Sequence, residues 1–256
     1  MKLHERLGLG IGAVGLEVSL EMLQIVESAQ ATTHYDIAWN KFRRARYQGL
    51  VALKYYILAE QHEARRHGKL CLERAEDFFH GSWRDEFIDP DGKHGTRWLQ
   101  EKFDWMEVFR ECLLWGSALG EWRFLKHCSG YPEKNACLSE GYTAQDRDAL
   151  VAISVIVSGD QAEKSSQCIN RAADGPRKGC RLLTEVLISL VNGKINSFEE
   201  GFISYLKHYK KTDFPKEQIT KKVSVEGTFL AHWARHHGMK VEVPSQFEDH
   251  IVKFPA

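Results

Sequence analysis

Apolar residues recur every three or four positions along most of this chain, the spacing that lines one face of an α-helix. In the first such segment, Leu16, Leu20, Leu23 and Val26 follow this spacing, and we predict a helix over residues 14–30. The same period continues in three further predicted helices: residues 39–59, 70–79 and 96–127.

The second half of the chain has shorter periodic segments with recognisable ends. Thr143, with Asp146 three residues later, is expected to cap a helix that stops at Gly159. Asn192-Gly193 supplies the left-handed residue that commonly follows a helix. Ser197 is expected to cap the next one. The predicted helices are residues 143–158, 160–172, 177–191, 198–209 and 224–237.

Two irregular stretches interrupt this pattern. Residues 81–95 (GSWRDEFIDPDGKHG) hold three glycines, a proline and four acidic residues, which mark a loop. Residues 129–142 form the second stretch, and they are the candidate boundary between helical halves at 1–128 and 143–256, which also fit one continuous domain.

These segments predict an all-α fold, an irregular stack of about nine antiparallel helices. Pro244 predicts a short extended C-terminal tail over residues 241–244. We find no fixed repeat period, so the chain does not match a known helical-repeat array.

The charge balance excludes one class of function. Lys and Arg together number 35, as do Asp and Glu, so the formal net charge is zero. A protein that holds nucleic acid by its phosphates normally carries a basic excess, and we predict no nucleic-acid partner.

The cysteines and the hydropathy indicate a cytoplasmic protein without a membrane anchor. No stretch reaches the roughly 18 uninterrupted apolar residues that a membrane-spanning helix needs. No two cysteines have the C-x-x-C spacing, and scattered cysteines in a long chain are typical of reduced thiols. The six are Cys71, Cys112, Cys128, Cys137, Cys168 and Cys180.

Residues 10–15 (GIGAVG) match the G-x-G-x-x-G dinucleotide fingerprint. That motif works only after a buried strand, and residues 1–9 are too short and too charged to form one. We therefore interpret the glycines as a flexible lead-in to a helix, and we predict no cofactor.

Histidines and carboxylates cluster at two places that resemble metal sites. Glu60, His62, Glu63 and His67 lie in one further helical segment (AEQHEARRH, residues 59–67). A salt-bridged helix face accounts for Glu63 with Arg66 and His67 just as well. His232 and His236 are four residues apart and share a helix face. Two imidazoles need a further ligand from elsewhere to hold a metal, whereas basic side chains also favour the last turn of a helix.

The sequence contains no motif for nucleophilic catalysis. Neither G-x-S-x-G nor a cysteine with family-specific flanks is present. Paired acids such as Asp146 and Asp148 carry no specificity in a chain with 35 of them. We therefore expect a non-catalytic protein.

The C-terminal third carries a resemblance to a known family. A helix and turn over residues 182–193 lead into SFEEGF (197–202) and YLKHY (205–209), followed by VEGTFL (225–230), ARHHGM (234–239) and PSQF (244–247). This succession resembles the C-terminal pattern of the Imm49 immunity-protein family of bacterial polymorphic toxin systems. More distantly, it is similar to the helical immunity proteins of PoNe-type DNase effectors. The resemblance covers about a third of the chain and implies no catalytic residues.

The resemblance implies that the chain binds a cognate toxin and blocks it by occlusion. A nuclease toxin would offer a basic groove, which an acidic surface could occupy. The candidate partner-binding residues are Asp85, Glu86, Asp89 and Asp91. A solvated turn with helix-starting acids is the more economical interpretation of the same residues, because loops are polar in any case. The alternative is a helical adaptor or scaffold protein without a toxin partner.

Overall fold

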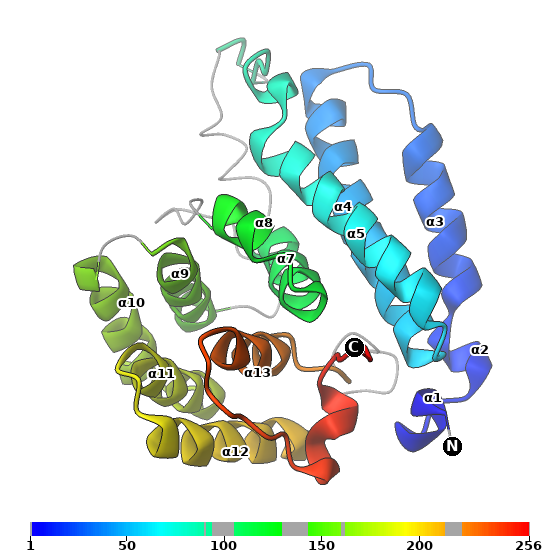
Figure 1. Ribbon diagram of the computed structural model, residues 1–256. Helices are drawn as coiled ribbons and strands as arrows, with labels where there is room; N and C mark the ends of the chain where they lie inside the picture. Colours follow the sequence, from blue (N-terminus) through cyan, green and yellow to red (C-terminus); the bar gives the residue numbers. More distant parts are fainter. Residues whose placement is uncertain are drawn as a thin grey trace.

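The computed structural model describes residues 2–89, 91–93, 105–129, 143–159, 162–212 and 222–255, with side chains from 106 and 166 onward in the third and fifth ranges. Within these ranges the chain is all-helical and contains no β-strand, as the apolar periodicity predicts (Figure 1). Twelve α-helices and two short 3₁₀ helices lie in the described residues, against the roughly nine helices predicted.

The N-terminal part is built on three helices that lie side by side (Figure 1). After the short α1 (Leu3–Arg6) and α2 (Ile11–Val14), the chain forms α3 (Leu16–Ser28), α4 (His34–Ile57) and α5 (Gln61–His80). Helix α4 begins earlier than the apolar pattern predicts, because Thr33 and Asp36 form a capping box ahead of it. Small buried residues on α5, among them Ala64 and Ala75, let α4 and α5 pack closely.

A central helix joins the two parts of the molecule. Helix α7 (Trp105–Leu119) packs against α4 and α5 on one side and α13 on the other. The single helix predicted over residues 96–127 is wrong, because Gly120, with φ of +74°, ends α7 and a separate α8 (Trp122–Cys128) follows. Residues 96–104 of that prediction lie outside the described residues.

The remaining helices form the second part of the molecule (Figure 1). They are α9 (Ala144–Ser158), α10 (Ala162–Asp174), α11 (Lys178–Val191), α12 (Ile195–Lys211) and α13 (Val225–His236). The predicted ends at Thr143, Gly159 and Gly193 are confirmed, since Thr143 caps α9 and both glycines have positive φ. The cap predicted at Ser197 is wrong: α12 starts at Ile195, because the Lys194 N–H donates to the Ser189 carbonyl in a tight turn.

The C-terminal segment returns to the N-terminal helices. Residues 239–244 are irregular, η3 (Ser245–His250) follows, and the last described residues run beside α4. The Tyr56 hydroxyl on α4 donates to the Ile251 carbonyl at 3.3 Å and accepts from the Lys253 N–H at 3.1 Å. Buried apolar residues from both predicted halves form one continuous core. The predicted boundary at residues 129–142 lies outside the described residues, apart from Ser129.

Candidate functional site

The four acidic residues predicted to bind a partner lie in one surface turn, which follows η1 (Ser82–Arg84). Three side chains anchor this turn to the end of α5. The Trp83 indole N–H donates to the Asp77 carbonyl at 2.7 Å, and the Arg84 guanidinium donates to the Phe78 carbonyl at 2.8 Å. Phe87 is 1% exposed in the core below. The turn is therefore fixed to the helices beneath it.

The acidic side chains of the turn differ in what they do. Asp85, Glu86 and Asp91 are exposed. Asp89 is half-buried, and its Oδ1 accepts from the Lys93 N–H at 2.8 Å, so this carboxylate shapes the turn. Ile88 is 36% exposed between them, with its N–H donating to His34 Nδ1 at 2.9 Å. The structure thus presents three carboxylates and one apolar side chain to solvent.

The glycine-rich segment lacks the context of a dinucleotide site. The short helix α1 precedes it where the fingerprint requires a strand. Gly15 adopts a φ of +60° at the start of α3, and its carbonyl accepts from Lys54 Nζ at 2.7 Å. Lys54 also contacts Ser19 Oγ at 2.6 Å. Gly15 thus serves the junction between α2, α3 and α4.

Two histidines of α5 approach Glu63: His62 Nδ1 lies 3.1 Å and His67 Nε2 lies 3.8 Å from its carboxylate oxygens. His62 is exposed, whereas His67 is 5% exposed, hydrogen-bonded to Gln48 and stacked on Tyr55 with ring centroids 5.1 Å apart. Burial lowers the pKa of His67. Glu63 pairs with Arg66 at 2.7 Å, as the salt-bridged helix face predicts.

His232 and His236 are each engaged by a different neighbour. His232 Nε2 donates to the Val252 carbonyl at 2.8 Å, and burial lowers the pKa of this imidazole. The His236 ring stacks on Trp122 with centroids 4.6 Å apart. In the part of the chain that the structure describes, no three His, Cys, Asp or Glu side chains come together in a way that could hold a metal ion.

The same two histidines line an open surface groove of about 410 Å³. It lies between the N-terminal end of α5, the turn from α7 to α8, helix α13 and the C-terminal segment. Its walls are basic and aromatic, with no acidic side chain among them. The lining residues are Arg65, Ser117, Ala118, Leu119, Gly120, Trp122, His232, Arg235, His236, Phe254 and Pro255.

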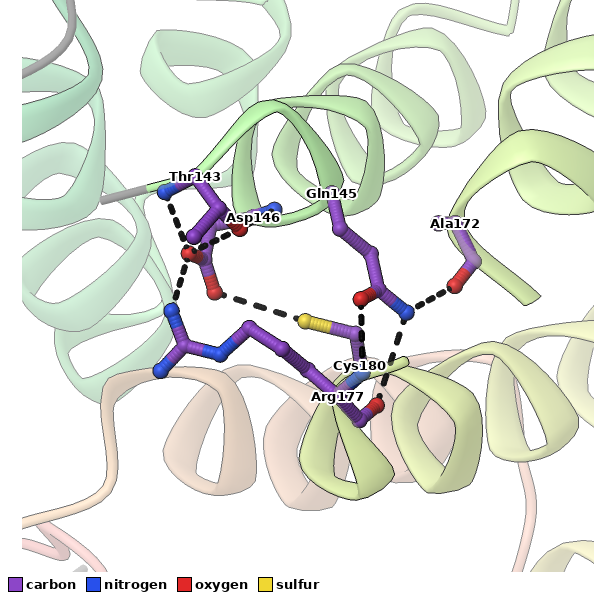
Figure 2. Close-up of polar contacts among 6 residues, drawn as sticks. All are labelled: Thr143, Gln145, Asp146, Ala172, Arg177 and Cys180. Atoms are coloured by element: carbon purple, nitrogen blue, oxygen red, sulfur yellow. Dashed lines mark hydrogen bonds and ion pairs between the residues drawn. The ribbon is translucent and has the colours of Figure 1, made fainter. Parts of the chain in front are cut away.

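Asp146 is occupied by a structural role (Figure 2). Its Oδ2 accepts from the Thr143 N–H at 2.7 Å and from the Arg177 guanidinium at 2.5 Å, and the Cys180 thiol lies 3.3 Å from its Oδ1. Burial and this carboxylate raise the pKa of Cys180 to about 12, so the thiol stays protonated.

Gln145 completes the same network. Its side-chain amide donates to the Ala172 carbonyl at 2.5 Å and accepts from the Arg177 N–H at 2.8 Å (Figure 2). Together with Asp146, it fixes the turn between α10 and α11 against the start of α9. These residues hold three helices in place.

Two other groups have shifted pKa values: the Glu111 carboxyl, which is mostly buried, and the buried Cys128 thiol. Burial raises the pKa of Glu111 to about 7, against the lowering effect of the Arg46 guanidinium. Contacts with the Cys112 thiol and the His80 imidazole lower the pKa of Cys128. Both cysteines are fully buried, so neither thiol is placed to attack a substrate. Cys137 lies outside the described residues.

The groove is the feature that reasoning from the sequence missed. Arg65, Trp122, Arg235 and Phe254 come from four separate regions of the chain, and only tertiary packing brings them together. The one available signal was the pair His232 and His236, which did mark this face of α13.

Comparisons with known proteins give no match of any of three kinds. No family model, no curated protein and no solved structure matches it. Among the helices described, none combines the length and the apolar character needed to cross a lipid bilayer.

Proposed function

We propose that this chain is a non-catalytic immunity protein that binds a cognate toxin in the cytoplasm and blocks it by occlusion. The resemblance of the C-terminal third to immunity proteins supports this proposal. The anchored acidic turn is the single structural observation that carries the proposal.

The geometry of the turn suits the recognition of a basic surface. Asp85, Glu86 and Asp91 are exposed on a loop whose own anchors, Trp83 and Phe87, are bonded to or buried in the helices below. A surface fixed before binding loses little conformational entropy when a partner docks. Its negative charge steers association with a positively charged groove, as a phosphate-binding nuclease toxin would present.

Ile88 supplies the apolar part of the same surface. Its side chain is 36% exposed among these carboxylates, while its N–H is bonded to His34 at the start of α4. Interfaces gain most of their affinity from a few desolvated contacts surrounded by polar ones. We therefore place Ile88 at the centre of the contact and the carboxylates around it.

Co-expression with the product of the neighbouring toxin gene tests the proposal. We expect the wild-type chain to restore the growth of cells that express the toxin, and to co-purify with it as a stable complex. Rescue without co-purification, or neither result, would contradict occlusion. A complex with a non-toxic partner would instead favour the helical adaptor.

A further inference from the structure

We propose that the groove between α5, α13 and the C-terminal segment is a second binding site, which takes an acidic peptide segment of a partner protein. Arg65 and Arg235 would bind its carboxylates, and Trp122, Leu119 and Phe254 would contact its apolar side chains. This site is separate from the acidic turn. Fifteen residues of α5 separate Arg65 from His80, which is about 22 Å along the helix.

No acidic side chain lines the groove beside its two arginines. Arg65 and Arg235 are both exposed, and within the described ranges neither forms an ion pair with a carboxylate. The neighbouring Arg66, in contrast, is paired with Glu63 at 2.7 Å. Glu248 interacts with Arg235 electrostatically, without forming an ion pair with it, and is itself paired with Lys253 at 2.8 Å. Two guanidinium groups that face one groove with no carboxylate in its lining favour an anionic ligand.

Both guanidinium groups are already held in place by backbone carbonyls. Arg65 Nη2 donates to the Pro255 carbonyl at 2.7 Å, and its guanidinium lies 4.4 Å from the centroid of the Phe254 ring. Arg235 Nε donates to the Val241 carbonyl at 3.0 Å. Each arginine keeps further N–H groups for a ligand. Because the arginines are fixed in advance, the binding of a carboxylate costs little conformational entropy.

The aromatic wall is also fixed. Trp122 packs edge-to-face on Trp233 at 5.5 Å and stacks on His236 at 4.6 Å. Aromatic and apolar side chains of a peptide can pack on such a wall while its acidic side chains reach the arginines.

The shape of the groove favours a peptide over a small metabolite. The groove has a volume of about 410 Å³ and is widely open to solvent. Sites for small molecules usually enclose most of the ligand surface, whereas a peptide segment that crosses a surface stays partly solvated. A short acidic segment, which carries one or two apolar side chains, matches both the charge and the opening.

Isothermal titration calorimetry of the full chain tests this site. The probe is a capped hexapeptide of alternating glutamate and phenylalanine, and the matched peptide has glutamine in place of glutamate. We expect saturable one-site binding of the acidic probe, and binding of the glutamine peptide that is weaker by about tenfold or more.

Variants locate the site. The double variant Arg65→Gln, Arg235→Gln should bind the acidic probe with an affinity lower by about tenfold or more. Arg65→Lys keeps the charge but loses the planar guanidinium, and its affinity should be intermediate. Arg66→Gln, one residue away and already paired, is the matched control and should bind as the wild type does. Thermal unfolding of each variant verifies that the C-terminal segment remains packed.

Three results would overturn the proposal. They are equal affinity of the double variant and the wild type, no saturable binding at millimolar peptide, and binding of adenosine monophosphate in place of the peptide. None of these affects the acidic turn, which is tested with a different partner and different variants.

Discussion

At the scale of single residues, the most unusual group in the described chain is the Glu111 carboxyl. It lies on α7 with 14% of its side chain exposed, and Arg46, 3.6 Å away, is shared with Glu107. Burial raises the pKa of Glu111 to about 7 from an ordinary value of 4.5. Between these two pH values the carboxyl is therefore still protonated in the folded state, whereas in the unfolded chain it has already lost its proton.

This proton makes stability depend on pH. Its stabilising effect is complete below about pH 4.5 and is lost as the pH rises through about 7. Between pH 5 and 8, this carboxyl should lower the free energy of unfolding of the wild type by up to about 3 kcal/mol. Glu111→Gln stays neutral at every pH, so its free energy of unfolding should not show this decrease. Urea unfolding at a series of pH values measures it. Glu17→Gln, on the exposed side of α3, is the control, and parallel curves for wild type and Glu111→Gln would contradict the assignment.

At the scale of helices, caps decide where the elements begin. Thr143 Oγ1 accepts from the Asp146 N–H at 3.3 Å and donates to its carboxylate at 2.8 Å. Thr143→Ala removes both contacts at the start of α9 and should cost about 1 kcal/mol of stability. Thr212→Ala, at the exposed C-cap of α12, is the matched control and should cost less. Equal losses in urea unfolding would show that the cap does not matter.

The same local signals set the limit of prediction from the sequence. Capping residues and glycines act within a few positions of the chain, so the helix ends at Thr143, Gly159 and Gly193 could be predicted from the sequence. The break at Gly120 was missed because Trp122 and Leu125 continue the apolar stripe in register across it. The start of α12 was missed because the close turn from α11, which buries Phe198 completely, outweighs the capping preference of Ser197.

The candidate sites divide in the same way. The acidic turn is one continuous segment, so its composition identified it before its anchors Trp83 and Phe87 were known. The groove joins residues as far apart as Arg65 and Arg235, and no pattern along the chain relates them. Only the packing of α13 and the C-terminal segment against α5 creates it.

At the scale of the whole molecule, the C-terminal segment ties distant parts of the chain together. Tyr56 on α4 makes two hydrogen bonds with it, to the Ile251 carbonyl and from the Lys253 N–H. Tyr56→Phe leaves both backbone groups without this partner and should destabilise the fold by about 1–3 kcal/mol.

The neighbouring tyrosine provides the control. The Tyr55 ring stacks on His67, and its hydroxyl makes no hydrogen bond among the described residues, so Tyr55→Phe should change stability little. Hydrogen exchange of the Lys253 amide should accelerate only in Tyr56→Phe. Unchanged exchange there would mean that the segment is held by other contacts.

The whole molecule also places two surfaces of opposite charge at opposite ends of α5. The acidic turn follows the C-terminal end of this helix, and the basic groove lies near its N-terminal end. The first is proposed to block a basic toxin surface, and the second to hold an acidic segment. Each is tested by its own variants, so one can fail while the other stands.

The central claim is tested most directly by calorimetry with the proposed cognate toxin. The wild-type chain is compared with the triple variant Asp85→Lys, Glu86→Lys and Asp91→Lys. Asp89 stays unchanged because its carboxylate shapes the turn. The control is the reversal of two exposed acids of α3, Glu17→Lys and Glu21→Lys. We predict that the triple variant weakens binding about tenfold or more, with a smaller dependence on salt, and that the control binds nearly as the wild type does. Equal affinity of the triple variant and the wild type would contradict occlusion through the acidic turn.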